Sequence, residues 1–303
     1  MHYSHSAKKI AVIGGGGFVG SSVFKALQTI NSDTIYTSRR NLISNYSKNF
    51  MQLDLFDKSS WNFLFNEFKP NVVICVAWET EHDKYWNKAT NFDYMNATID
   101  FATTCLQGAV DKFIGFGSMS EYGFSPGKCN AETSLVNPQD SYSEAKVLTS
   151  IALSKIAGDL GKKANWVRLF QPYGINEKPN RLIPTLIKNI INDTPITVKF
   201  PDHTLDFTHI SDVANAVKLI ATNDFNYSVN IGTGVATSIR SVCSTLGQIS
   251  GYDLDKIIFD RPDQNYERII FVDPEHDIFK KWQHKFNLFD GLKQTFMEVS
   301  ECL

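Results

Sequence analysis

The sequence predicts an α/β fold in which a doubly wound parallel sheet is covered by helices. Through the first half of the chain, short apolar segments typical of buried parallel strands alternate with longer segments that have helical periodicity. A run of glycines at residues 14–17 follows the first apolar segment directly. Ligands of such sheets bind beyond the carboxyl ends of the strands, so we expect a binding site at that edge.

The expected elements alternate in order along the first half of the chain. The expected strands are Ile10–Ile13, Asp33–Thr37, Val72–Ala77, Lys112–Phe116 and Asn165–Phe170. The expected helices are Phe18–Gln28, Ser60–Phe68, Phe92–Gln107 and Ser141–Ala157. The carboxyl ends of the strands then fall at Gly14, Ala77, Ser118 and Phe170. Aromatic residues follow one side of the second helix, which indicates packing against the core.

The second half of the chain is less regular. Helical patterns cover Arg181–Ile191 and Ser238–Ile249, and the serine is a suitable N-cap for the latter. Residues Thr208–Ala221 combine the end of a strand with a helix, and Lys256–Phe259 has the pattern of a short strand. The sequence shows no repeat, linker or low-complexity tract between these elements and the first half.

The glycine run has the spacing of a dinucleotide-binding turn. Two registers fit, Gly14-x-x-Gly17-x-x-Gly20 and Gly15-x-Gly17-x-x-Gly20. Glycine permits a tight turn and a close approach of the backbone to a pyrophosphate, whose charge is attracted by the free N–H groups at the helix start. A strand before and a helix after supply the context that this motif requires. We therefore expect cofactor contacts from Gly14, Gly17, Phe18, Val19 and Gly20.

Tyr142 and Lys146 form a Y-x-x-x-K pair that is suited to proton transfer. On a helix, a spacing of four places both side chains on one face. An ammonium near a phenol stabilises the phenolate, which lowers the pKa of the tyrosine and makes it a usable acid or base. Ser118 lies at the end of a predicted strand, and its hydroxyl can hydrogen-bond the substrate oxygen that exchanges the proton. We expect these three residues to be catalytic.

Together these features resemble the extended short-chain dehydrogenase/reductase family, in particular its nucleotide-sugar epimerases, dehydratases and reductases. Further similar motifs follow in order at residues 54–55 (DL), 118–123 (SMSEYG), 168–174 (RLFQPYG), 206–213 (DFTHISDV), 230–234 (NIGTG) and 261–263 (RPD). The resemblance implies a Rossmann-type dinucleotide-binding domain at 8–172 plus 205–233. It also implies a smaller, discontinuous C-terminal lobe at 173–204 plus 234–303, which binds the substrate.

The resemblance also assigns expected roles to single residues. Asp54 and Leu55 resemble the pair that borders the adenine of the cofactor. Further cofactor contacts are expected from Ala77, Trp78, Tyr142 and Lys146. Substrate contacts are expected from Ser118, Met119, Ser120, Gln171, Arg181 and Arg261. The glutamine replaces the family's usual asparagine, and Arg261 is suited to pair with a diphosphate.

The end of the second strand bears on which nicotinamide cofactor is bound. An acidic residue normally holds the ribose 2′-hydroxyl of NAD at this position, whereas this chain reads Ser38-Arg39-Arg40. Two guanidinium groups and a hydroxyl suit a 2′-phosphate. We therefore expect NADP(H), with NAD(H) as the alternative if the arginines are merely solvated.

The residues after Ser118 reduce the number of reaction types that the resemblance allows. Dehydratases of the family carry an Asp-Glu pair directly after the catalytic hydroxyl residue, where this chain has Met119 and Ser120. Ser120 also stands where decarboxylating members have glutamate and where enzymes that form GDP-fucose have cysteine. Glu121, in an extended segment, would point to the other face. We expect NADPH-dependent reduction of a nucleotide-linked 4-keto-6-deoxy sugar, with an NAD(P)-dependent nucleotide-sugar 4-epimerase as the alternative.

The loop at residues 77–86 is unusually polar and aromatic for its position. Trp78 and Trp86 are suited to pack on the nicotinamide or the sugar. His82 is expected to be a surface residue rather than an acid or base. A binding protein that has lost catalysis is a further alternative, against which the intact serine, tyrosine and lysine argue.

Composition and charge exclude several classes of function. The net charge of −2 argues against a nucleic-acid partner. No apolar stretch approaches the roughly 20 residues that span a bilayer, and residues 1–9 lack the apolar core of a signal peptide. The five cysteines lack metal-type spacing, so we expect no metal. These observations favour a cytoplasmic protein.

The resemblance implies a homodimer that is formed through two helices of each chain. The corresponding segments here are Phe92–Gln107 and Ser141–Ala157. Both carry more apolar side chains than one sheet face requires, including Ile99, Leu148 and Ile151. We therefore expect pairing of two copies through these helices.

Overall fold

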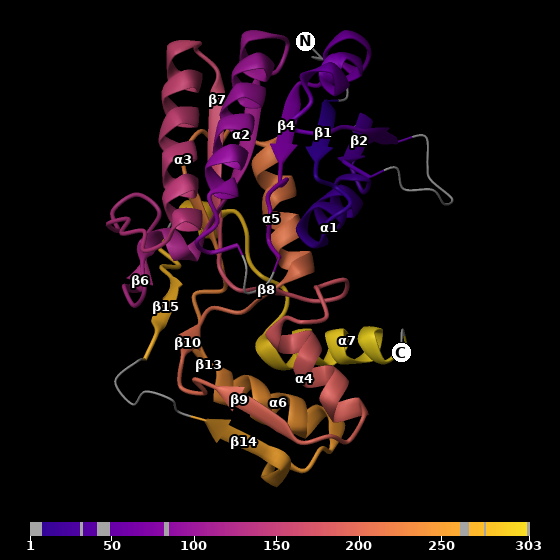
Figure 1. Cartoon of the computed structure of the whole chain (residues 1–303), viewed down its shortest axis with the longest axis vertical. Helices are drawn as coiled ribbons and strands as arrows, with labels where there is room; N and C mark the ends of the chain where they lie inside the picture. The colour runs from indigo at the N-terminus through magenta and orange to yellow at the C-terminus, as the bar shows by residue number, and fades with distance from the viewer. Residues whose placement is uncertain are drawn as a thin grey trace. The chain divides into compact units, whose positions relative to one another are not determined.

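The computed structural model of the protein describes residues 8–30, 33–40, 49–81, 85–260, 267–275 and 277–301 (Figure 1). The chain forms two compact units. Unit 1 comprises residues 1–121, 138–168 and 214–229, and unit 2 comprises residues 122–137, 169–213 and 230–303. The expected division into a cofactor domain and a substrate lobe remains a prediction.

The main sheet has seven strands in the order β12-β7-β5-β4-β1-β2-β3. They are β1 (Lys9–Ile13), β2 (Asp33–Ser38), β3 (Phe50–Gln52), β4 (Val72–Cys75), β5 (Lys112–Ser118), β7 (Lys163–Leu169) and β12 (Val229–Ile231). The chain moves outward from β1 to β2 and β3, then returns past β1 to β4 and β5, and these neighbours pair in parallel. The direction of winding therefore reverses between β1 and β4, which confirms the predicted doubly wound sheet.

Seven α-helices lie in the described part of the chain (Figure 1). They are α1 (Phe18–Leu27), α2 (Thr90–Gln107), α3 (Ser141–Asp159), α4 (Leu182–Ile191), α5 (Ile210–Thr222), α6 (Ile239–Ser250) and α7 (Leu288–Ser300). α2 and α3 pack side by side. Phe101 of α2 and Phe113 of β5 are fully buried in one core cluster, because the apolar side chains of helix and sheet face each other.

The helix predicted at residues 60–68 is not an α-helix. Lys58–Trp61 forms a 3-10 helix, and Leu64–Phe68 forms a π-helical turn that ends at Lys69 in the left-handed region, with φ 53°. The predicted aromatic face is buried nonetheless, with the ring centroids of Trp61 and Phe101 at 5.0 Å. The apolar periodicity therefore identified the buried side but not the hydrogen-bonding pattern of the backbone.

Unit 2 is built from shorter elements. Its strands are β6 (Gly127–Cys129), β8 (Pro172–Tyr173), β9 (Ile196–Lys199), β10 (Thr204–Leu205), β11 (Thr208–His209), β13 (Thr237–Ser238), β14 (Ile257–Asp260) and β15 (Ile269–Val272). This unit also contains the 3-10 helices Leu254–Lys256 and Asp277–Lys280, whereas a further 3-10 helix, Met119–Tyr122, begins in unit 1. The helix predicted after Ser238 is confirmed, and the serine hydroxyl accepts a hydrogen bond from Ser241 N as its cap.

A buried carboxylate organises the loops of unit 2. Asp206 is fully buried, and its Oδ1 accepts hydrogen bonds from the N–H and hydroxyl of Thr233, both at 2.7 Å. Its Oδ2 accepts from Gly234 N at 2.8 Å and from Val272 N at 3.2 Å. Burial raises the pKa of this carboxyl, against which the four donors act. The aspartate of the DFTHISDV motif therefore holds three chain segments together.

None of the helices in the described ranges is both long and apolar enough to cross a membrane.

We expect Asp206→Asn to lower the free energy of unfolding by about 1–3 kcal/mol, because the new amide N–H₂ would face two buried N–H donors. Urea titration followed by circular dichroism measures the change. Asp255→Asn is the control, since that carboxylate is exposed and its loss should cost less than about 0.5 kcal/mol. Equal stability of the two variants would contradict the assigned role of Asp206.

Candidate active site

The turn that follows β1 has a backbone conformation and close contacts that require glycine. Gly14 has φ 82°, and a Cβ there would lie 2.9 Å from Ala77 N. A Cβ on Gly20 would lie 2.4 Å from Gly14 O, so α1 packs directly on the turn. A Cβ on Gly17 would meet only Gly14 O, at 3.4 Å. The turn and the packing of α1 therefore require Gly14 and Gly20, and the space beside Gly17 permits a close approach. A Cβ on Gly15 would lie 2.5 Å from Tyr36 Cβ, so both registers start at a position that requires glycine.

The start of α1 fits the pyrophosphate of a dinucleotide. Gly17 is the N-cap residue, and among the described residues no side chain caps this helix. The first N–H groups, including those of Phe18, Val19 and Gly20, lie at the positive end of the helix dipole. Backbone donors and open space above Gly17 are what an anionic group requires there.

The two arginines after β2 are exposed. Arg39 donates from Nη1 to Tyr94 Oη at 3.5 Å, and Ser38 Oγ accepts from Arg40 N at 3.3 Å. Burial raises the pKa of the Tyr94 hydroxyl, and Arg39 acts in the opposite direction. Within the described ranges, neither guanidinium forms an ion pair with a carboxylate. Both side chains are thus accessible to a ligand at the end of β2.

Asp54 and Leu55 lie in a tight turn after β3. Asp54 Oδ1 accepts from Phe56 N at 3.1 Å, and its backbone carbonyl accepts from Trp61 Nε1 at 3.0 Å. Leu55 is buried in the core. These contacts fix the backbone of the turn and leave its role toward an adenine a prediction.

Tyr142 and Lys146 both lie on α3, as the spacing predicted. The helix starts with a capping box in which Asp140 Oδ1 accepts from Ser143 N at 2.8 Å. Tyr142 N donates to Trp86 O at 3.0 Å. Both side chains of the pair are buried, and Lys146 Nζ lies 5.7 Å from the centroid of the Tyr142 ring.

The Lys146 ammonium is enclosed. Its Nζ donates to Phe116 O at 2.7 Å and lies 3.6 Å from the ring centroid of Trp78. Burial lowers the pKa of Lys146 to about 7, against the opposing influence of Glu121 and Cys75. The amine therefore changes its charge near neutral pH.

An aromatic cluster surrounds the Tyr142 ring on one side. Trp78, Tyr85 and Trp86 meet this ring edge-on, with centroid distances of 6.4, 4.8 and 5.6 Å. Trp78 and Trp86 thus contact Tyr142, and their expected packing on the nicotinamide or the sugar stays a prediction. His82 lies outside the described residues. The sequence did not indicate Tyr85 as part of the cluster, because nothing in its spacing marks it.

Ser118 ends β5, but the residues after it are not extended. Met119–Tyr122 forms a 3-10 helix, so the expectation of an extended segment is wrong. The turn directs Glu121 into the interior, where its carboxylate accepts from Ser118 N at 2.9 Å, from Trp166 Nε1 at 3.0 Å and from Arg168 Nε at 2.6 Å. Glu121 and Arg168 thus form a buried ion pair, which the sequence did not indicate.

The remaining expected substrate residues lie in separate places. Met119 and Ser120 are buried beside Ser118 in unit 1. Gln171 and Arg181 belong to unit 2. Arg261 lies outside the described residues. Among the residues that the structure does describe, no group of three or more His, Cys, Asp or Glu side chains is placed to hold a metal ion.

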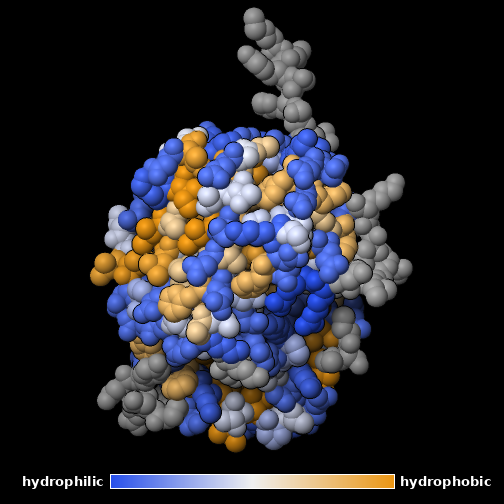
Figure 2. Space-filling view, turned by 45° about the horizontal axis from the view of Figure 1, so that its top comes forward, coloured by the Kyte–Doolittle hydropathy of each residue, from blue (hydrophilic) through white to orange (hydrophobic). Residues whose placement is uncertain are grey.

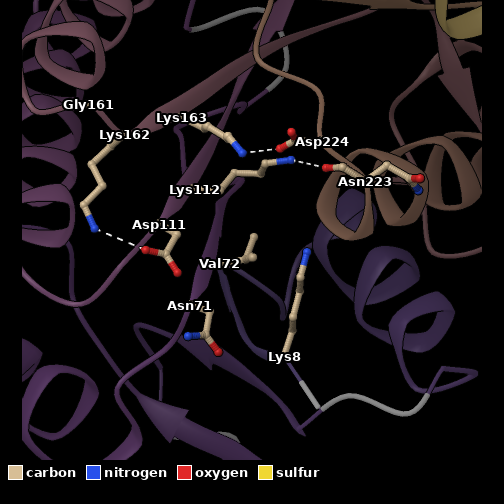
Figure 3. A pocket seen from close by; sticks show the side chains of 10 residues that line it. All are labelled: Lys8, Asn71, Val72, Asp111, Lys112, Gly161, Lys162, Lys163, Asn223 and Asp224. Carbon is tan, nitrogen blue, oxygen red and sulfur yellow. Dashed lines mark hydrogen bonds and ion pairs between the residues drawn. The ribbon is translucent and has the colours of Figure 1, made fainter. Parts of the chain in front are cut away.

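A pocket of about 360 Å³ lies at the opposite, amino-terminal edge of the strands (Figure 3). Lys112 donates from Nζ to the carbonyls of Ile220 and Asn223, at the carboxyl end of α5. Burial lowers the pKa of Lys112 to about 8. Figure 3 shows Lys163 paired with Asp224 in the same pocket. These lysines offset the negative end of the helix dipole and are remote from Gly14 and Ser118 along their strands.

The doubly wound parallel sheet and the glycine turn at the end of β1 are features of dinucleotide-binding enzymes. The chain belongs to the NAD dependent epimerase/dehydratase family, whose model matches residues 10–232. This confirms the predicted branch of the extended short-chain dehydrogenase/reductases and makes the protein a nicotinamide-dependent enzyme.

Known relatives are similar over almost the whole chain. A putative UDP-glucose 4-epimerase from Methanocaldococcus jannaschii is 26% identical over 94% of this chain and 96% of its own length. The dTDP-D-glucose 4,6-dehydratase of Bos taurus is 24% identical over 95% of this chain and 88% of its own.

Solved structures share the fold. The UDP-glucose 4-epimerase of Thermotoga maritima with UDP-glucose superposes with a TM-score of 0.81 at 22% identity, and covers 97% of this chain and 99% of its own. The UDP-glucose 4-epimerase of Thermus thermophilus with NAD has a TM-score of 0.82 at 19% identity, with 97% and 100% covered.

We expect Gly17→Ala to weaken cofactor binding by about tenfold or more, because the new methyl group would enter the space above the turn. The fold should tolerate it, since only one atom lies within 4 Å of the new Cβ. Gly158→Ala on α3, where nothing lies within 4 Å, is the control and should bind cofactor as the wild type does. Calorimetric titration with NADPH and NADH measures both variants, and unchanged binding by Gly17→Ala would place the cofactor elsewhere.

Proposed function

We propose that the protein is an NADPH-dependent reductase of a nucleotide-linked 4-keto-6-deoxy sugar. The observation that carries the proposal is the segment after Ser118, which presents Met119 and Ser120 where related dehydratases need two acids. The nearest carboxylate, Glu121, is fully buried and accepts hydrogen bonds from Trp166, Arg168 and a backbone N–H. A carboxylate held by these donors is not available to remove a proton in an elimination.

The substrate class is supported by the names of the relatives. The proteins from Methanocaldococcus jannaschii and Bos taurus are named for UDP-glucose and dTDP-D-glucose, and each is similar to nearly all of this chain. We infer a nucleotide sugar as the substrate here, contacted by Ser118, Met119 and Ser120 from unit 1. Gln171, Arg181 and Arg261 are the proposed contacts from the rest of the chain.

The chemistry is assigned to the Ser-Tyr-Lys set. In the proposed reaction, the Tyr142 hydroxyl donates its proton to the oxygen on C4 of the sugar, while the Ser118 hydroxyl hydrogen-bonds that oxygen. Lys146 places a positive charge beside Tyr142, which favours loss of the phenolic proton. When bound, the nicotinamide supplies the hydride to C4. The residues that would hold it are the turn glycines, the start of α1, and Tyr142 and Lys146.

NADP(H) is the proposed cofactor, for which the end of β2 is the support. Arg39 and Arg40 are exposed, and no carboxylate stands at this position to hold a ribose 2′-hydroxyl. The name of the family and the NAD complex of the Thermus thermophilus enzyme favour NAD(H) as the alternative. The two cofactors differ by one phosphate, so the arginines decide between them.

A 4-epimerase is the second candidate function. It is favoured by the names of relatives in both comparisons, the putative enzyme from Methanocaldococcus jannaschii and the enzyme from Thermotoga maritima. The same Ser118, Tyr142 and Lys146 would serve, because oxidation and re-reduction at C4 also need one acid/base. The two candidates differ in whether the cofactor is consumed.

The reductase should oxidise one NADPH for each 4-keto sugar consumed. UDP-, GDP-, CDP- and dTDP-linked 4-keto-6-deoxyhexoses are incubated with enzyme and NADPH, and absorbance at 340 nm is compared with product formation. Tyr142→Phe should lose roughly 10²–10⁴-fold in kcat, because only the proton-transfer group is removed. Its cofactor affinity should stay near that of the wild type. Interconversion of 4-hydroxy sugars without net oxidation of cofactor would establish the epimerase instead.

Replacing both arginines should weaken NADP(H) binding and leave NAD(H) binding nearly unchanged. We expect Arg39→Ala/Arg40→Ala to lose roughly 1.5–3 kcal/mol of NADP(H) affinity for each charged contact to the 2′-phosphate. Calorimetric titration of both cofactors gives the difference. Arg240→Ala is a suitable control, since this arginine pairs with Asp202 in unit 2. Tighter binding of NAD(H) than NADP(H) by the wild type would overturn the cofactor proposal.

We also propose a homodimer that pairs through α2 and α3. Leu148 and Ile151 of α3 are 48% and 60% exposed, which is unusual for apolar side chains on a helix that already packs on the sheet. Figure 2 shows hydrophobic residues gathered on the left of the view, the side on which α2 and α3 lie in Figure 1. A second copy of the chain would cover them.

The four described cysteines are free and buried, in keeping with a reducing cytoplasm.

Leu148→Lys/Ile151→Glu should convert a dimer to a monomer, because the charges would be buried at the proposed contact. Light scattering coupled to size exclusion at micromolar concentration gives the mass. Leu135→Lys, which changes an exposed leucine outside these helices, should remain dimeric. A wild-type protein of monomer mass would exclude this pairing.

A further inference from the structure

The Lys146 ammonium has no carboxylate partner among the described residues. Glu121 and Cys75 are the titratable groups whose charge acts on it, in addition to the neighbouring Tyr142. Glu121 is engaged by Arg168 at 2.6 Å. Burial raises the pKa of the Cys75 thiol to about 12, so this group is neutral at working pH. A buried ammonium without a counter-ion requires other compensation.

Two neighbours supply that compensation. Phe116 O accepts a hydrogen bond from Lys146 Nζ at 2.7 Å. The ring of Trp78 lies 3.6 Å from Nζ, measured to its centroid, whereas the rings of Tyr142 and Trp166 lie at 5.7 and 5.8 Å. The negative face of an indole attracts a cation most strongly where water is excluded.

The Trp78 ring is itself held in place. Its Nε1 donates to Asn91 Oδ1 at 3.1 Å, and its face stacks on Tyr94 with centroids 5.7 Å apart and an interplanar angle of 30°. Asn91 is 1% exposed. The indole is therefore fixed by α2 from two directions.

Asn91 also connects the indole to the start of α3. Its Nδ2 donates to Tyr85 O at 2.6 Å and lies within hydrogen-bond distance of Ser141 Oγ, at 3.3 Å. Ser141 Oγ in turn donates to Trp86 O at 3.0 Å, and Tyr142 N donates to the same carbonyl. One amide side chain thus sets the indole and the first turn of the catalytic helix relative to each other.

We propose that Trp78 is a positioning residue of the active site, whose indole face holds the Lys146 side chain and keeps its amine charged beside Tyr142. The proposal rests on the proposed function only in that Lys146 assists proton transfer by Tyr142. Removing the aromatic face while the site stays buried would disfavour the ammonium. The amine would then lose its proton at a lower pH than in the wild type.

The first test uses the cofactor-free enzyme and needs no substrate. Tryptophan fluorescence is recorded from pH 5 to 10, and the wild type should show a transition near pH 7 as Lys146 loses its charge next to the indole. Lys146→Met should abolish this transition, and Trp78→Phe should remove most of it, since the other nearby indole, Trp166, is farther from Nζ, at 5.8 Å. A wild-type signal that does not titrate, or a transition that persists in Lys146→Met, would overturn the proposal.

The second test compares two replacements of Trp78 in the pH dependence of kcat/KM for the cofactor-dependent reaction. Trp78→Phe keeps an aromatic face, and Trp78→Leu removes it. The alkaline limb of the leucine variant should move to lower pH by about 0.5–1.5 units, with a smaller shift for the phenylalanine variant. Trp282→Leu, which removes a buried indole of unit 2, should leave the position of the limb unchanged.

Equal shifts for leucine and phenylalanine, or a shift in the Trp282→Leu control, would show a packing effect and refute the role of the aromatic face. The fluorescence titration separates this inference from the proposed function. A chain that proves to be an epimerase would still show the transition, because the indole and the amine meet in the absence of substrate.

Discussion

A charged amine in the interior of the protein is the constraint on which the rest of the site depends. Lys146 is almost completely buried, and desolvation works against its ammonium form. Its position is tolerable only because a carbonyl at the end of β5 and the Trp78 face meet the charge. The packing of α3 on β5, and the hold of α2 on the indole, are therefore part of the chemistry and not only of the core.

Two buried carboxylates are likewise tolerated because neighbouring groups compensate their charge. Glu121 is acceptable in the interior because Arg168, Trp166 and a backbone N–H satisfy its oxygens. Asp206 is acceptable because four donors, from the loop after β12 and from the end of β15, converge on it. In each case the carboxylate fixes a chain segment and is withdrawn from catalysis. The hydroxyls of Ser118 and Tyr142, with the Lys146 amine, are the groups to which we assign the proposed chemistry.

Much of the fold and part of the candidate site could be predicted from the sequence, because these features depend on local periodicity and spacing. The parallel sheet follows from the apolar runs, the turn from glycine spacing, and the shared helix of Tyr142 and Lys146 from their separation of four. The turn at 119–122 could not be predicted, since only the buried partners of Glu121 favour it over an extended segment. The contact of Trp78 with Lys146 joins residues 68 positions apart, and no pattern in the sequence specifies it.

The protonation of Lys146 can be measured directly by nuclear magnetic resonance, with lysine labelled with carbon-13 at the ε position and a pH titration of the cofactor-free enzyme. One resonance, lost in Lys146→Met, should have a midpoint near pH 7, and a second resonance, from Lys112, should have a midpoint near pH 8. A Lys146 midpoint near the reference lysine value of about 10.4 would overturn this assignment, because the amine would then be solvated and not held against Trp78.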